Sequence, residues 1–301
     1  MTGRDVVITD PRRPAASPIE RIRAYLVLAK LRIIELLLIT TLPAMVLAAG
    51  DWPGTWLVVA TLAGGTLSAG GANAINNYVD RDIDAKMRRT RHRPLPAHRV
   101  GDAEALAVGT ALGTAGFVLL WATVNLPAAL LSTASLLFYV FVYSMVLKRS
   151  TPQNIVIGGA AGAGPVLVGW AAVTGSIGLG AWILFAIVFF WTPPHFWALA
   201  LRHRDDYERA GVPMLPVVAG ERATTDQILA YTVLLVGISL LLQPVAGLGT
   251  LYLSSAGALG GWFLVGAFRL RDDTARAMAF FRDSNLYLAL LFGAVALDVL
   301  V

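Results

Sequence analysis

The chain has 301 residues, of which 56% are hydrophobic and only 14% are charged, and its mean hydropathy is +0.66. This composition is too apolar for a soluble domain, in which about half of the residues are apolar, and it indicates a polytopic membrane protein. Membrane topology and anionic lipid headgroups account for the net charge of +5, so we predict no nucleic-acid partner.

The first 22 residues are polar and precede the apolar part of the chain. Asp5, Asp10 and Glu20 stand among the arginines of this segment, whereas mitochondrial transit peptides are poor in acidic residues. We therefore interpret 1–22 as a polar N-terminal segment and 23–301 as a single transmembrane domain. The chain has no cysteine, which excludes disulfides and thiolate metal ligands.

Nine apolar runs follow, each close to the roughly 20 residues that a helix needs to cross a hydrocarbon core. They lie near 33–50, 55–79, 103–124, 126–147, 155–174, 178–200, 227–246, 249–268 and 285–301. Each run must be helical within lipid, because every backbone N–H and C=O group needs an internal partner there. The sequence therefore predicts an all-α fold with nine transmembrane helices.

The positive charges fall on one side of these predicted spans. All 24 Lys and Arg residues lie in the segment up to Arg32 or in alternate connections, 80–100, 148–154, 201–226 and 269–284. This positive-inside pattern predicts a cytoplasmic N-terminus and a C-terminus on the opposite side of the membrane.

The second predicted span ends in an acidic motif with four-residue spacing. Asn76, Asp80 and Asp84 advance about 400° around a helix at each step, so they form one stripe with about 6 Å between successive positions. Hard oxygen ligands of this kind suit Mg²⁺, which takes one or two carboxylates and completes its shell with water and phosphate oxygens. Asp82 lies on a different face. The alternative is that these acids belong to a solvated helix end and form weak surface ion pairs.

The sixth predicted span also ends in an acidic cluster, which contains Asp205 and Asp206 on the same predicted side of the membrane. Its position four spans after the first motif suggests a duplicated four-helix unit, 23–150 and 151–270, with 285–301 added. A second cluster beside further cations favours a ligand-binding role for both motifs over a solvated surface.

Three segments carry a resemblance to a known family. NNYVDRDID followed by RTRHRPL, within 76–95, resembles the first signature of the UbiA-type intramembrane prenyltransferases, whose NxxxDxxxD motif matches Asn76, Asp80 and Asp84. Within that superfamily, KRSTPQNIVIGG at 148–159 and TPPHFWALALRHRDDYERAGVPMLPVV at 192–218 resemble the protoheme IX farnesyltransferases, also called heme O synthases. Arg202 departs from the pattern, because the superfamily usually has an acid there, three residues before the Asp pair.

The resemblance implies a UbiA-type helix bundle and a specific reaction. A farnesyl group would pass from farnesyl diphosphate to a vinyl group of heme B, with addition of water, giving heme O and diphosphate. Asn76, Asp80, Asp84, Asp205 and Asp206 would hold Mg²⁺ together with the diphosphate.

The departing diphosphate concentrates negative charge, which fixed cations stabilise more strongly in the transition state than in the substrate. Arg89, Arg93 and Lys148 are our candidates for this catalytic role. His195 follows two prolines in the sixth predicted span, and a polar ring at membrane depth indicates a functional contact. It could ligate the heme iron, bond a propionate or cap the proline-broken backbone.

The resemblance also implies a location and partners. We expect a multi-pass protein of the inner (plasma) membrane with its active site toward the cytoplasm, and contact with heme A synthase or a terminal oxidase assembly. One alternative keeps the Mg²⁺-dependent ionisation but prenylates an aromatic quinone precursor. The other is a secondary transporter, although such a protein would place its charges near the bilayer midplane.

Overall fold

The computed structural model describes the backbone of residues 18–301 and the side chains of residues 19–30 and 39–301. Residues 1–17 of the predicted polar segment lie outside the described residues. Within 18–301 the fold is all-helical, as predicted, with no strand. The long helices are α2 (Leu31–Ala49), α3 (Thr55–Val79), α5 (Asp102–Thr123), α6 (Leu126–Leu137), α8 (Asn154–Thr174), α9 (Leu179–Arg202), α12 (Gly220–Ala246), α13 (Thr250–Asp272) and α14 (Ala277–Leu300). The short elements are α1 (Pro18–Ala29), α4 (Arg81–Lys86), the π-helix η1 (Phe138–Leu147), α7 (Lys148–Ser150), α10 (Arg204–Arg209), α11 (Leu215–Val218) and the 3₁₀ turn η2 (Thr274–Arg276).

Eight membrane-spanning candidates are present in the described part of the chain, and they correspond to the second through ninth predicted spans. The first predicted span corresponds to α2, whose fully described part, Ile39–Ala49, forms a shorter apolar helix. The count of nine therefore stays a prediction. Two spans begin earlier than hydropathy indicated, at Gly220 and Ala277, because polar residues follow within their first helical turns, GERATTDQ in α12 and RDSN at 282–285 in α14.

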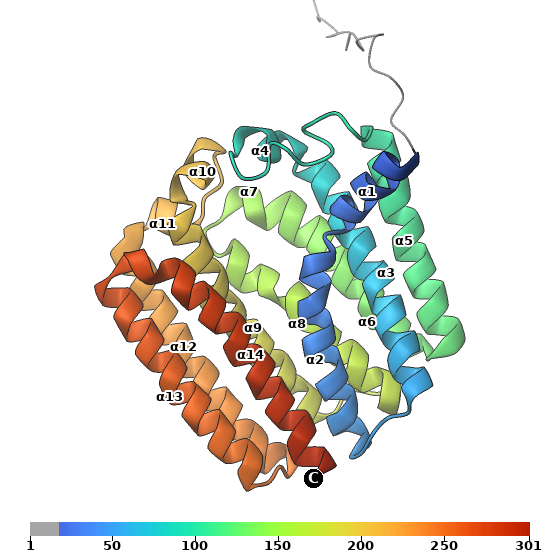
Figure 1. Ribbon diagram of the computed structural model, residues 1–301, viewed down its shortest axis with the longest axis vertical. Coiled ribbons are helices and arrows are strands. Elements are labelled where there is room, and N and C mark those ends of the chain that lie inside the picture. Colours follow the sequence, from blue (N-terminus) through green and yellow to red (C-terminus); the bar gives the residue numbers. More distant parts are fainter. Residues whose placement is uncertain (1–17) are drawn as a thin grey trace, which may run out of the picture.

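The long helices pack in a closed circuit. In spatial order, α2 contacts α3, α3 contacts α5, and the circuit continues through α6, α8, α9, α12, α13 and α14 back to α2 (Figure 1). Glycines permit a close approach between α3 and α5 within this circuit. A Cβ atom on Gly71 would lie 2.6 Å from the carbonyl oxygen of Gly109, so neither backbone could hold a larger residue without moving.

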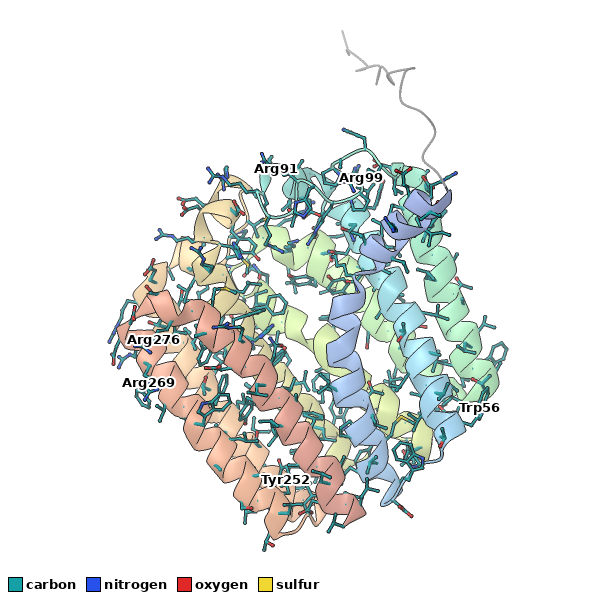
Figure 2. All side chains as sticks on the ribbon, viewed as in Figure 1. Trp56, Arg91, Arg99, Tyr252, Arg269 and Arg276 are labelled. Carbon is teal, nitrogen blue, oxygen red and sulfur yellow. The ribbon has the colours of Figure 1, made fainter. Side chains whose placement is uncertain are left out.

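The two ends of the bundle differ in their chemistry. The short helices α1, α4 and α10 lie at one end, and the C-terminus lies at the other (Figure 1). Arg91 and Arg99 lie at the α4 end, whereas Trp56 and Tyr252 lie toward the opposite end (Figure 2). Both acidic motifs therefore lie at the same end of the bundle, as the charge pattern predicted.

Helix interruptions position the acidic motifs at this end. Helix α3 stops at Val79, and Asp80 has bridge-region dihedral angles (φ −90°, ψ 4°) before α4 begins. His203 separates α9 from α10 in the same way (φ −112°, ψ 23°). A third interruption, at Lys30 between α1 and α2, has a left-handed backbone (φ 51°), which is uncommon for a residue with a side chain. Helix α1 itself was not predicted, and it begins inside the segment interpreted as polar.

Candidate active site

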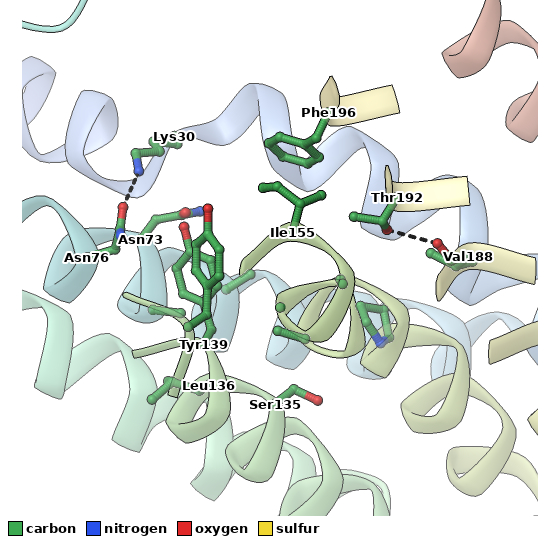
Figure 3. Close-up of a pocket in the computed structure, with 18 of the residues that line it drawn as sticks. Lys30, Asn73, Asn76, Ser135, Leu136, Tyr139, Ile155, Val188, Thr192 and Phe196 are labelled. Atoms are coloured by element: carbon green, nitrogen blue, oxygen red, sulfur yellow. Dashed lines mark hydrogen bonds between the residues drawn. The ribbon is translucent and has the colours of Figure 1, made fainter. Parts of the chain in front are cut away.

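A cavity of about 440 Å³ lies inside the bundle, within the roughly 300–1,000 Å³ typical of small-molecule sites. Its lining divides into a charged part and an apolar part. The polar groups nearest the acidic motif are Lys30, Asn76, Asp80, Asp84, Arg89, Arg93 and Lys148. The remaining wall is mainly apolar and aromatic, and it includes Leu136, Tyr139, Ile155, Val188, Trp191 and Phe196. Lys30, Asn76 and Tyr139 lie on one side of the view in Figure 3, with Phe196 and Thr192 on the other.

The first acidic motif faces this cavity as one stripe. Asp80 and Asp84 are only 1% and 2% exposed, although both are carboxylates. The helical hydrogen-bond pattern continues through the interruption, since the Asp80 N–H donates to the Asn76 carbonyl and the Asp84 N–H donates to the Asp80 carbonyl. The predicted four-residue stripe is thus maintained across two helices.

Each of the two buried carboxylates forms an ion pair with a cationic side chain. Lys148 forms an ion pair with Asp80, and Arg93 forms one with Asp84 at 2.8 Å. Arg89 also lines the cavity. All three predicted catalytic cations therefore lie at the charged end, where four cationic side chains, counting Lys30, face two carboxylates.

Lys30 is a site residue that the sequence analysis missed. Its Nζ atom donates a 2.7 Å hydrogen bond to Oδ1 of Asn76 (Figure 3). Burial, together with the nearby charge of Arg93, lowers the pKa of Lys30 to about 7. The signal in the sequence was a lysine at the edge of an apolar run, a pattern that usually marks an interface anchor.

The charged end fits a divalent cation that shares its ligands with a phosphate group. Oδ2 of Asp80 accepts hydrogen bonds from Asn76 and Lys148, but its Oδ1 atom is buried without a hydrogen-bond partner. A buried carboxylate oxygen without a partner is costly unless another ligand completes it. Within the described residues, no group of three or more His, Asp or Glu side chains could hold a metal alone. Mg²⁺ suits such an incomplete set, because it takes its other ligands from water and phosphate.

Asn76 and Asp82, which lie near Asp80 in the sequence, are bound to other side chains in the structure. The Oδ1 atom of Asn76 accepts from Lys30, and its amide nitrogen donates to Asp80 and to Ser144 at 2.9 Å. Asp82 points to another face, as predicted, and pairs with Arg149 at 2.7 Å. The Arg149 guanidinium lowers the pKa of Asp82 to about 2.

The second acidic cluster lines a separate pocket of about 500 Å³ beside the cavity. Asp206 accepts backbone N–H bonds from Arg88 and Arg89 and pairs with Arg209, whereas Asp205 is exposed. Burial works to raise the pKa of Asp206, but those N–H groups and Arg209 lower it overall. The cluster therefore holds the loop after α4, and Arg89 lines both cavities.

The π-helix η1 supplies the aromatic wall next to the charged end. Tyr139 and Tyr143 stack with ring centroids 5.4 Å apart, and both line the cavity. The hydroxyl of Ser144 donates to the Tyr139 carbonyl at 2.8 Å while accepting from Asn76. The wide turn thus connects the tyrosine wall to the acidic motif.

His195, the predicted heme contact, lines the apolar part of the cavity on α9. Its ring lies between two aromatic rings, Trp191 at 4.2 Å and Phe281 at 4.3 Å between centroids. Its Nδ1 atom lies 2.7 Å from the hydroxyl oxygen of Ser284 on α14. The imidazole is therefore held by two helices and has an apolar environment.

Comparison with known proteins identifies the family. The model of the UbiA prenyltransferase family matches residues 37–291. The chain is 54% identical to a protoheme IX farnesyltransferase of Frankia alni over 93% of its own length and 99% of that protein. The chain belongs to the UbiA prenyltransferase family. It is therefore a membrane prenyltransferase, and the family resemblance seen in its motifs is confirmed.

Solved structures support the fold of this UbiA-family protein. It superposes on a structure of digeranylgeranylglyceryl phosphate synthase with a TM-score of 0.76 at 19% identity, covering 93% of this chain and 99% of the other. It also matches a UbiA homolog from Archaeoglobus fulgidus bound to DMAPP and Mg²⁺, with a TM-score of 0.64 at 16% identity, covering 90% and 98%. The predicted UbiA-type bundle is thus confirmed.

Proposed function

We propose that this protein transfers a farnesyl group from farnesyl diphosphate to a vinyl group of heme B, with addition of water, giving heme O and diphosphate. The observation that carries the proposal is the two-part cavity, in which buried acids and cations adjoin an apolar, aromatic chamber. The name of the Frankia alni relative, at 54% identity, supports the choice of prenyl donor and acceptor.

The charged end suits the diphosphate of the donor. Lys148, Arg93 and Arg89 provide fixed cations at the place where the carbon–oxygen bond would break. Negative charge on the leaving diphosphate grows as that bond lengthens, so these cations stabilise the transition state more than the substrate. Arg suits bidentate contact with phosphate oxygens, whereas Lys acts as a point charge.

Asp80 and Asp84 would hold Mg²⁺ at this end, with the unpartnered Oδ1 atom of Asp80 as a ligand. When bound, the ion would neutralise part of the charge on the diphosphate leaving group. Asn76, Asp205 and Asp206 stay predicted ligands. Asn76 would have to release Lys30 to bind the ion through its amide oxygen, and Asp206 would have to release the backbone of Arg88 and Arg89.

The apolar chamber suits the farnesyl chain and the porphyrin. Excluding water there protects the allylic cation from premature capture. The ring faces of Tyr139 and Tyr143 line the route between the two parts of the cavity and can stabilise positive charge on carbon. His195, in the aromatic part, would contact the heme.

The proposal includes a plasma-membrane location, and the charge pattern supports an active site that faces the cytoplasm. Both acidic motifs and the basic loop 80–100 lie at the α4 end of the bundle (Figure 1), which the positive-inside rule assigns to the cytoplasm. Heme B would then be taken from the cytoplasmic side or from the bilayer. Contact with heme A synthase or a terminal oxidase assembly stays a prediction.

The test is a reconstitution with two competing acceptors. Purified protein would be incubated with Mg²⁺, farnesyl diphosphate and either heme B or 4-hydroxybenzoate, and the products would be separated by chromatography and mass spectrometry. Formation of farnesyl-hydroxyethyl heme with release of diphosphate supports the proposal. Prenylation of the aromatic acid alone would assign the quinone-precursor activity instead.

A further inference from the structure

The hydroxyl of Ser284 has one proton, and the structure assigns that proton to a backbone acceptor. Oγ of Ser284 lies 2.7 Å from the carbonyl oxygen of Phe281, one turn earlier in α14. A carbonyl oxygen cannot donate a hydrogen bond, so the hydroxyl must be the donor in this pair. The same oxygen lies 2.7 Å from Nδ1 of His195. Its proton is already used, so it can only accept from the imidazole.

This geometry fixes the tautomer of His195. Nδ1 must carry the proton that is donated to Ser284, and in a neutral imidazole the other nitrogen, Nε2, then keeps its lone pair. No residue within the described part of the chain hydrogen-bonds to Nε2. His195 lines the cavity, whereas Ser284 is fully buried behind it. The free lone pair on Nε2 therefore lies on the side of the imidazole ring that faces away from Ser284.

The surroundings keep the imidazole neutral and restrain its rotation. Trp191 and Phe281 stack against its two faces and Phe196 meets it edge-on, so three aromatic rings surround the imidazole. Trp191 also donates a hydrogen bond from Nε1 to the Ser284 carbonyl at 2.7 Å. This bond connects α9 to α14 at Ser284, the residue that orients His195. An apolar environment disfavours the imidazolium form, so this lone pair is better suited to coordination than to taking up a proton.

We propose that Ser284 is a positioning residue, which holds His195 as the Nδ1–H tautomer so that Nε2 coordinates the iron of the acceptor heme. This inference rests on the proposed heme acceptor and deepens it. Coordination would fix the plane of the porphyrin in the apolar part of the cavity. One vinyl edge would then be free to face the farnesyl diphosphate. A metal-bound histidine commonly donates its other N–H to an oxygen, which orients the ring and makes it a stronger ligand.

The experiment measures heme binding without the prenyl donor, so that coordination is tested apart from turnover. Ferrous heme B is added to the full-length protein in lipid nanodiscs, and resonance Raman spectroscopy detects the iron–imidazole stretch. His195→Ala is expected to remove this band, and free imidazole is expected to restore histidine-like ligation. Ser284→Ala is expected to lower the stretching frequency and to weaken heme binding about 10-fold or more, as the loss of such an orienting partner typically does.

Two further variants separate this effect from general loss of a buried hydroxyl. Ser284→Cys keeps a polar hydrogen at the same position but accepts a hydrogen bond weakly, so it should reproduce the effect of Ser284→Ala. Ser239→Ala removes another fully buried hydroxyl, which is bonded to Tyr287 one turn further along α14 and not to His195, and it should leave the band unchanged.

The outcomes for the two proposals are distinguishable. Wild-type protein that forms farnesylated heme but shows no iron–imidazole band overturns the coordination and leaves the proposed function intact. A wild-type band that does not change in Ser284→Ala or Ser284→Cys overturns the positioning role. Failure to farnesylate heme B, whatever the spectrum shows, counts against the proposed function.

Discussion

Replacing Asp80 by Asn tests the charged end of the cavity most directly. The substitution keeps the shape of the side chain but removes the charge that Lys148 pairs with, and it weakens the unpartnered oxygen as a ligand. A bound metal contributes several kcal/mol to stabilising a leaving group, and a loss of about 4 kcal/mol lowers kcat/KM about 10³-fold. We expect a fall of this order in diphosphate release from farnesyl diphosphate.

The protein should stay folded in this variant. Removing one partner of a fully buried ion pair costs about 3–5 kcal/mol, but Lys148 is 14% exposed and retains access to the cavity, so the loss should be smaller. Thermal unfolding in detergent measures this loss of folding stability separately from enzyme activity.

Asp82→Asn is the matched control. It removes the same charge two residues later from an exposed pair with Arg149, which is worth at most about 1 kcal/mol. The assay is coupled detection of released diphosphate at saturating heme B. Asp80→Asn turnover within 10-fold of wild type, or an equal loss in Asp82→Asn, would refute the assignment of the metal site to this helix face.

Three other outcomes are expected. Lys148→Met should raise the KM for farnesyl diphosphate and lower kcat by about 10-fold or more, whereas Arg149→Met, at an exposed pair, should change both by less than about 3-fold in steady-state assays. Chelation of Mg²⁺ should abolish diphosphate release and readdition should restore it; full activity after chelation contradicts the metal's role. Gly71→Ala should destabilise the α3–α5 contact by about 1–3 kcal/mol, whereas a Cβ at Gly237 meets nothing within 4 Å, so Gly237→Ala should melt at or above the wild-type temperature.

The sequence predicted the parts of this molecule that depend on local periodicity. Apolar runs located the spans because lipid leaves the backbone no alternative to a helix. The four-residue spacing predicted that Asp80 and Asp84 share a face, and the structure shows both lining the cavity. Charge asymmetry placed both acidic motifs at one end of the bundle.

What the sequence could not predict depends on tertiary contacts between distant segments. Lys30 itself has the left-handed backbone that separates α1 from α2, and nothing in its own sequence neighbourhood indicates its contact with Asn76. The pairing of His195 with Ser284 joins positions 89 residues apart. The sequence made Asp206 a candidate metal ligand but could not show that it accepts bonds from backbone N–H groups of the loop after α4, because those groups have no sequence signature.

The wide turns of η1 have a consequence for how this segment tolerates insertions and deletions. A π-helix accommodates an extra residue relative to the α-helix that would otherwise connect the same end points. Deleting one residue between Phe138 and Leu147 would therefore return the segment to ordinary α geometry between the same end points, and Lys148 would stay beside Asp80. The same deletion in the α-helical turns of α6 would instead rotate everything after it by about 100°. The segment η1 is thus the place in this span where the chain can lose one residue without displacing the charged residues that follow.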